Sequence, residues 1–176
     1  MTEHIEQSEN GATSSPAVIP AQPAPDLLEK ANDLVRKRVY WSIGVGFVPV
    51  PLVDFAALLG IQLEMVSRIA TVYGQSFRRD VGKNLLVSLL GSVVPSLAAG
   101  PVAGLLKFIP IIGYTTSVMT FSIVGGASTY AIGQLFIKHF ASGGTLFDFD
   151  PARMKEEFSE KFKEGKEYVA DLKKGA

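Results

Sequence analysis

Residues 84–137 contain one charged side chain, Lys107, and this stretch constrains the fold more than any other feature of the sequence. Lys107 divides it into residues 84–106 and 108–137, which hold 23 and 30 residues. About 20 apolar residues in a helix cross a hydrocarbon core of about 30 Å, whereas helices of soluble proteins usually carry a charged face. The sequence therefore predicts a central apolar helical hairpin embedded in a membrane. Two helices buried inside a soluble bundle are the alternative.

The segments on either side of the hairpin predict an all-α fold of about five helices. Residues 1–25 are rich in Pro, Ser and Ala and have little apolar surface to bury, so we expect a disordered tail. Residues 26–140 form the predicted helical, membrane-associated domain, and residues 141–150 form a loop. Residues 151–176 predict an amphipathic C-terminal helix, which could dock on the protein, lie on a membrane or bind a partner.

The second predicted helix begins at Pro51, because proline suits the first turn of a helix. Gln62, Glu64 and Arg68 lie on its flanks and back, so we expect an amphipathic helix that does not span a membrane. Its predicted apolar face consists of Asp54, Ala57, Leu58, Ile61, Met65, Ile69 and Val72.

The composition argues against catalysis. The chain has no cysteine, which excludes disulfides, thiol nucleophiles and cysteine-ligated metals. Its two histidines, His4 and His139, are too few for a histidine-rich metal site, and no Ser/His/Asp arrangement or pair of acids has catalytic spacing. The formal net charge is zero and the basic residues are few, so we do not expect nucleic-acid binding. We therefore expect no enzyme activity, no cofactor and no metal.

Several short motifs follow one another between residues 27 and 140. They are Phe47-Val48-Pro49-Val50-Pro51-Leu52-Val53-Asp54, Gln62-Leu63-Glu64-Met65, Ile69-Ala70, Tyr73-Gly74, Phe108-Ile109-Pro110-Ile111-Ile112-Gly113, Gly125-Gly126-Ala127, Tyr130 and Gly133. This ordered set resembles the YcjF-like family of bacterial domains of unknown function. The resemblance implies an α-helical, membrane-associated domain without known enzymatic activity, often encoded beside or fused to Era-type or dynamin-like GTPases. This chain lacks the phosphate-loop pattern G-x-x-x-x-G-K-[ST], so a GTPase partner would be another chain.

Asp54 is a candidate for a buried polar site, because a carboxylate on an apolar helix face is costly to bury without a partner. Its candidate partners are Arg68, Lys107 and the hydroxyls of Thr115 and Thr116. One alternative is an ordinary first-turn acid that is open to water and stabilised by the helix dipole. A buried ion pair with a purely structural role is the other.

Two further sets of residues are candidates for contacts. Basic residues near an anionic surface contribute about 1 kcal/mol each, although the same residues could be solvated surface charges; they are Arg36, Lys37, Arg38, Arg78 and Arg79. Small residues at helical spacing allow close helix packing, within the hairpin or between copies in a homo-oligomer; they are Gly100, Gly104, Ser122, Gly126, Ala127 and Ala131.

Basic residues flank the outer ends of the hairpin, whereas its turn carries Lys107 alone. By the positive-inside rule both ends of the hairpin face the cytoplasm. The resemblance to a bacterial family implies the inner membrane of a bacterium. The resemblance implies the function of a non-enzymatic accessory or scaffold protein, with membrane lipid and a GTPase as partners. One alternative is a soluble helical bundle that binds a partner helix or a lipid. Another is a small channel or transporter, suggested by Asp54 and the proline-broken helices.

Overall fold

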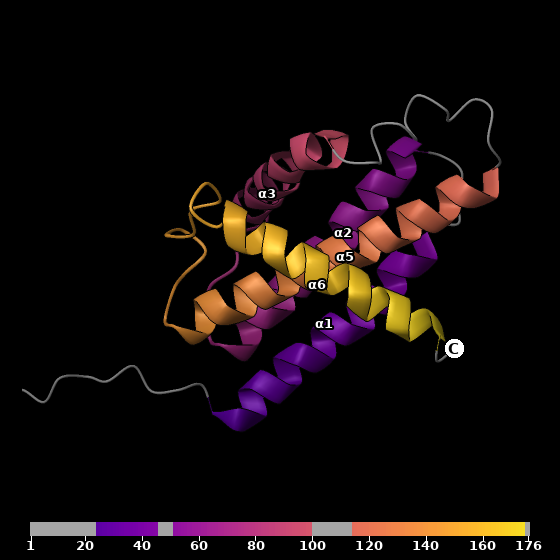
Figure 1. Ribbon diagram of the computed structural model, residues 1–176. Coiled ribbons are helices and arrows are strands. Elements are labelled where there is room, and N and C mark those ends of the chain that lie inside the picture. Colours follow the sequence, from indigo (N-terminus) through magenta and orange to yellow (C-terminus); the bar gives the residue numbers. More distant parts are fainter. Residues whose placement is uncertain (1–23, 46–50, 100–113, 175–176) are drawn as a thin grey trace, which may run out of the picture.

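The structure is a computed structural model that describes residues 24–45, 51–99 and 114–174. The described residues form five helices: α1 (Pro25–Val45), α2 (Pro51–Val72), α3 (Arg79–Ala99), α5 (Tyr114–Ala141) and α6 (Lys155–Lys174) (Figure 1). This confirms the predicted all-α fold of about five helices. The predicted tail and the turn of the predicted hairpin lie almost entirely outside the described residues.

The ends of the helices follow local sequence signals. Gly74 adopts a φ of 66° just after α2, a conformation that glycine accepts without strain and that commonly ends helices. The amide of Gln75 then donates to the carbonyl oxygen of Ala70 at 2.8 Å. Before α6, the carboxylate of Asp150 accepts the amide of Ala152 at 2.9 Å, so Asp150 caps the turn that leads into this helix.

Helix α5 lies at the centre of the bundle and packs against α1, α2 and α6 (Figure 1). Helix α3 packs instead on α2 and α6. The turn of the predicted hairpin and the side chains next to it lie outside the described residues, so the packing of the two apolar segments against each other stays a prediction. The described part of α5 is apolar around most of its circumference, so three neighbours are needed to cover it. Helix α6 docks on the protein, which is the first of the three roles considered for it.

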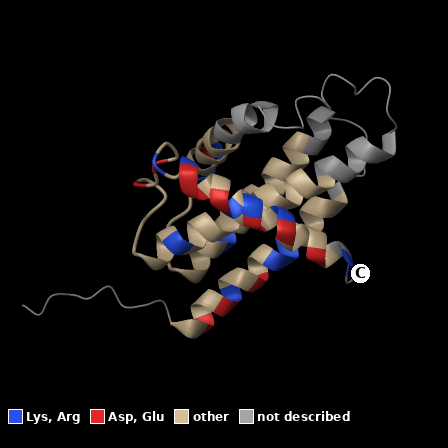
Figure 2. Cartoon of the chain, viewed as in Figure 1, with Lys and Arg blue, Asp and Glu red and all other residues tan. Residues whose placement is uncertain are grey.

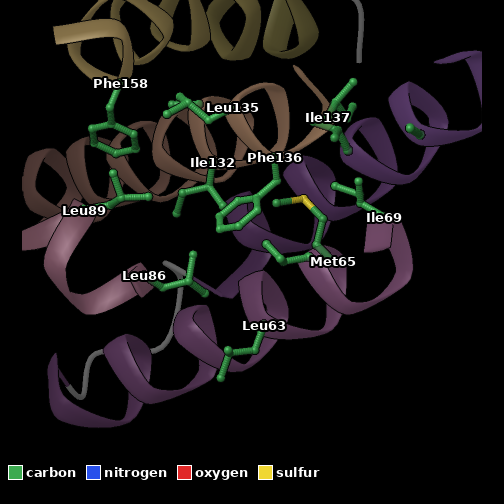
Figure 3. Close-up of a cluster of buried hydrophobic side chains, with 14 of the residues drawn as sticks. Leu63, Met65, Ile69, Leu86, Leu89, Ile132, Leu135, Phe136, Ile137 and Phe158 are labelled. Atoms are coloured by element: carbon green, nitrogen blue, oxygen red, sulfur yellow. The ribbon is translucent and has the colours of Figure 1, made fainter. Parts of the chain in front are cut away.

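One core cluster joins buried side chains of α2, α3, α5 and α6. In Figure 3 the ring of Phe158 points from α6 toward Leu89 of α3, and the ring of Phe136 lies beside Met65 of α2. All four side chains are fully buried. The loop after α5 closes this region, because the ring of Phe149 stacks on Phe136 with a centroid distance of 4.4 Å.

The buried face of α2 differs from the predicted one. Met65 and Ile69 are buried as expected, but Gln62, which was placed on a polar flank, is fully buried, and Ala57, which was placed on the apolar face, is exposed. Nearly every position between residues 55 and 63 is apolar. A helix of this kind has a weak periodic signal, and the signal could not select the correct face.

Among the described residues, one helical segment is long and apolar enough to cross a membrane by length and composition, and this segment is Phe55–Val72 of α2. This is the helix that the sequence predicts to be amphipathic and not to span a membrane, and Glu64 and Arg68 are the only charges in the segment. The prediction that it does not span stays a prediction. The predicted spans 84–106 and 108–137 both extend outside the described residues.

Candidate functional site

Contacts between α1 and α5 show which residues lie at the same level of the bundle. A Cβ atom on Gly133 of α5 would overlap the side chain of Val35 of α1. One on Gly126, about two turns earlier in α5, would lie 3.0 Å from Cγ1 of Ile43, about two turns later in α1. The two helices are therefore antiparallel, and the C-terminal part of α1 lies beside the N-terminal part of α5.

Helix α2 approaches the same level from its own N-terminal half. The side-chain amide of Gln62 donates to the Thr129 hydroxyl at 3.2 Å, and Leu58, one turn earlier, lies against Gly125. Residues 39–44, 55–63 and 122–129 thus form one end of the bundle. These residues include no Lys, Arg, Asp or Glu, and we call them the uncharged end. Figure 2 shows charged residues along α6 and along the part of α1 that precedes the uncharged end.

A layer of uncharged polar side chains crosses the interior at the border of the uncharged end. The Ser42 and Thr129 hydroxyls are 2.7 Å apart, and the Gln62 amide also donates to the Ser128 hydroxyl at 3.1 Å. All four side chains are buried. The layer joins α1, α2 and α5 and fixes their register. Because it contains no carboxylate, imidazole or amine, it offers no general acid or base.

Two atoms near this layer lack a partner. Gln62 Oε1 and Ser122 Oγ are buried without a hydrogen bond. The hydroxyls themselves share too few protons, because Ser42 Oγ also lies 2.9 Å from the Arg38 carbonyl oxygen and Thr129 Oγ1 lies 2.9 Å from that of Gly125. The Ser42 and Thr129 hydroxyls have one proton each, but they make three contacts, one with each other and one with a carbonyl oxygen each. Either Ser42 donates to Thr129 or Thr129 donates to Ser42, so the layer has two alternative donor patterns.

The predicted polar site around Asp54 is not assembled by the residues that the structure describes. The guanidinium of Arg68 is 56% exposed and binds the Glu64 carboxylate at 2.8 Å. Asp54 and Arg68 are 14 positions apart on one continuous helix, or about 21 Å at 1.5 Å per residue, so the structure does not bring these two together. Lys107 and the side chains of Thr115 and Thr116, like that of Asp54, lie outside the described part.

The predicted basic residues are on the surface. Arg36 and Lys37 are exposed, and they lie within one turn of the start of the uncharged end on α1. Arg38 is half-buried, and its guanidinium binds the Glu64 carboxylate of α2 at 2.7 Å. Arg78 and Arg79 are exposed at the start of α3.

The predicted small residues within α5 are buried, and two of them lie against α1 or α6. Gly126 packs against Ile43 of α1 and Val169 of α6, and the backbone of Ala127 lies against Gly165 of α6. Ser122 and Ala131 are also buried, whereas Gly100 and Gly104 lie outside the described residues. The sequence-based reasoning missed Gln62, Ser42, Ser128, Thr129 and Gly165. The adjacent polar pair Ser128-Thr129, inside an apolar stretch, was an available signal.

At the opposite end of the bundle, the start of α1, the end of α5 and the start of α6 come together, and we call this the charged end. It carries an open hollow of about 350 Å³ between these three helices. Its rim includes the Lys138–Glu157 ion pair, with an N–O distance of 2.8 Å. In the part of the chain that the structure describes, no group of three or more His, Asp or Glu side chains is placed to hold a metal ion. The hollow is lined by Leu28, Gln134, Ile137, Lys138, Ala141, Ser142, Glu157 and Lys161.

Beside the hollow, His139 ties the loop after α5 to that helix. Its Nε2 lies 2.8 Å from the Thr145 carbonyl oxygen and 3.2 Å from Asp148 Oδ1. The carbonyl oxygen only accepts, so Nε2 carries the proton. Asp148 also accepts the amide and the hydroxyl of Thr145. These two bonds, followed by the one from His139, lower the pKa of Asp148 below its ordinary value.

Comparison with known proteins gives a family and a relative. The family model of a domain of unknown function, DUF697, matches residues 26–167. The chain is 34% identical over 157 residues to magnetosome membrane protein 22 of Magnetospirillum gryphiswaldense, an alignment that covers 87% of this chain and 80% of the relative. No solved structure matches significantly. Because the family model spans most of the chain, the protein belongs to the DUF697 family.

Proposed function

We propose that this protein is a non-enzymatic, membrane-associated accessory or scaffold protein whose uncharged end enters a lipid bilayer. The observation that carries the proposal is that the described side chains of α1, α2 and α5 at the uncharged end include no charged group. The charges beside this end lie on α6, which packs against it through Val169 and Gly165. Helices in water usually carry charges along their exposed side. Here the exposed positions of the uncharged end are occupied by Tyr40, Trp41, Gly44, Phe55, Ala56 and Ala57.

The buried polar layer is consistent with a structural role in such an environment. Hydroxyls and amides that bond across helices hold membrane bundles together, and Ser42, Gln62 and Thr129 do so across three helices. The similarity to a protein named as a magnetosome membrane protein supports membrane association.

For location we propose the cytoplasmic membrane of a bacterium. For orientation we propose that both ends of the apolar segment 84–137 lie in the cytoplasm. The charged end supports this, since Arg36 and Lys37, Arg78 and Arg79, and Lys138 all lie outside that segment and cytoplasmic segments are enriched in Lys and Arg. The partner that we propose is a GTPase supplied by another chain. Its support is the resemblance together with the missing phosphate-loop pattern.

The test is fractionation of cells that express the full chain, in which membranes are washed with high salt, then with carbonate, and finally with detergent. We expect release by detergent alone. A monodisperse protein in the soluble fraction would overturn the proposal in favour of a soluble bundle. Release by salt would also overturn bilayer entry, because charge contacts alone would then hold the protein.

The partner is tested separately, by measuring GTP hydrolysis in the detergent-purified complex before and after a salt wash. We expect the complex to hydrolyse GTP, and we expect this activity to be removed together with a second polypeptide by the salt wash. The isolated chain is expected to be inactive. Hydrolysis that stays with the pure chain would overturn the non-enzymatic assignment. If only further copies of this chain co-purify, the GTPase partnership is wrong and the scaffold is a homo-oligomer.

A further inference from the structure

We propose that the boundary between water and an anionic phospholipid bilayer runs through Trp41 of α1, with Phe55 inside the hydrocarbon and Arg36 and Lys37 among the lipid phosphates. This inference rests on the proposed function, and it adds a depth and a lipid class to it.

The first step is the exposure of large side chains at the uncharged end. Trp41 is 66% exposed, and Tyr40 and Phe55 are each 47% exposed. Indole and phenol rings combine an apolar body with a polar N–H or O–H, and Trp and Tyr are therefore enriched where a membrane meets water. Phe has no polar group and suits a deeper position.

The second step is the relative depth of these residues. Ser42 and Gln62 both bond to Thr129, so Trp41 lies close to the level of Gln62. Phe55 precedes Gln62 by seven positions, which is about 10 Å further along α2 toward the uncharged end. Tryptophan thus lies at the border of this end, and phenylalanine lies inside it.

The third step is charge. Arg36 and Lys37 precede Trp41 by five and four positions, which places them about 6–8 Å from it along α1, on the side of the charged end. Within the described residues neither forms an ion pair, whereas their neighbour Arg38 binds Glu64. Two exposed cations beside an interfacial tryptophan are complementary to the phosphates of anionic lipids.

Trp41 is the only tryptophan in the chain, so the unmodified protein carries its own probe. The full chain is reconstituted in vesicles of phosphatidylcholine and phosphatidylglycerol, with quenchers attached to the lipid chains near the headgroup or near the chain end. The double variant W41F/F55W moves the probe to the deeper position. The control W41F/F147W moves it to Phe147, which is 61% exposed in the loop after α5, at the charged end.

We expect stronger quenching of Trp41 by the shallow quencher than by the deep one, and the reverse order for W41F/F55W. The control is expected to respond to iodide in the water and to neither lipid quencher. If the vesicles bind the protein but neither lipid quencher acts on Trp41, the boundary is wrong while membrane association stands. Shielding of Trp41 from lipid and iodide alike would show that a second copy covers it. If the protein stays in solution, the proposed function itself fails.

The lipid class is tested by quenching Trp41 with brominated phosphatidylglycerol or brominated phosphatidylcholine at equal mole fraction. We expect a preference for the anionic lipid of about fivefold for each cation. The double variant R36Q/K37Q is expected to abolish it. The control K155Q/K163Q removes two exposed lysines of α6 and is expected to keep the preference. Equal quenching by both lipids in the unmodified protein would overturn the assignment of anionic lipid.

Discussion

Gly165 of α6 lies so close to Ala127 of α5 that a Cβ atom on Gly165 would be 2.7 Å from the Ala127 carbonyl oxygen. The obstacle is backbone, which cannot rotate away. The absence of a side chain at Gly165 therefore sets how closely the C-terminal helix approaches the centre of the bundle, and the stacked rings of Tyr130 and Tyr168, with centroids 5.0 Å apart, lie beside this crossing.

Replacing Gly165 with alanine is expected to destabilise the protein by about 1–3 kcal/mol, because α6 must move away from α5. This loss would outweigh the gain of up to about 1 kcal/mol in helix propensity. Thermal unfolding in one mild detergent measures the change. The matched control is Gly60→Ala in α2, where a new Cβ meets nothing within 4 Å, and this variant is expected to be neutral or stabilised. Equal stability of the two variants would contradict the close crossing.

The crossing of α1 and α5 is tested by Gly133 and Val35. A Cβ atom on Gly133 would overlap both methyl groups of Val35, so Gly133→Ala is expected to lower the free energy of unfolding by about 1–3 kcal/mol. Val35→Ala removes those methyl groups. The double variant should therefore lose less stability than the sum of the two single losses, with a coupling of about 0.5–3 kcal/mol. Additive losses in a double-mutant cycle would show that the two residues are not in contact.

Gln62 and Thr129 are expected to respond oppositely to apolar replacement. Gln62→Leu removes the unpartnered Oε1 atom, while the Ser128 and Thr129 hydroxyls still donate to the Gly125 carbonyl. We expect this variant to be neutral or slightly stabilised. Thr129→Val removes an acceptor of the Gln62 amide and should cost about 1 kcal/mol. A loss of several kcal/mol in Gln62→Leu, measured by denaturant unfolding, would show that Oε1 has a partner in the folded protein.

Much of the fold follows from local signals, whereas the packing does not. Pro51, Gly74 and Asp150 mark the ends of helices through backbone restrictions and capping, which operate within a few residues, and the structure has helix ends at or close to all three. The buried face of α2 and the neighbours of α5 depend on contacts between distant segments. Uniformly apolar stretches carry little periodicity to predict such contacts, and for this reason Gln62 was assigned to the wrong face.

The loop after α5 is expected to lose stability in acid because of Asp148. Hydrogen bonds from the amide and hydroxyl of Thr145, and then from His139, hold the pKa of Asp148 below its ordinary value. The folded state therefore favours the ionised carboxylate. Its contribution to stability is fully present above the pKa of the unfolded chain, about 3.9, and is lost as the pH falls through the lower pKa of the folded protein.

Asp148→Asn tests this prediction. Thermal unfolding across a pH series should show the largest difference between the unmodified protein and Asp148→Asn above about pH 5, and the difference should shrink as the pH approaches 3. The control is Asp171→Asn in α6, which removes an exposed carboxylate bound to Lys174 in the next turn. A difference for Asp148→Asn that stays constant over this range would mean that the Thr145 bonds do not favour the ionised carboxylate. The loop would then be held chiefly by the stacking of Phe149 on Phe136.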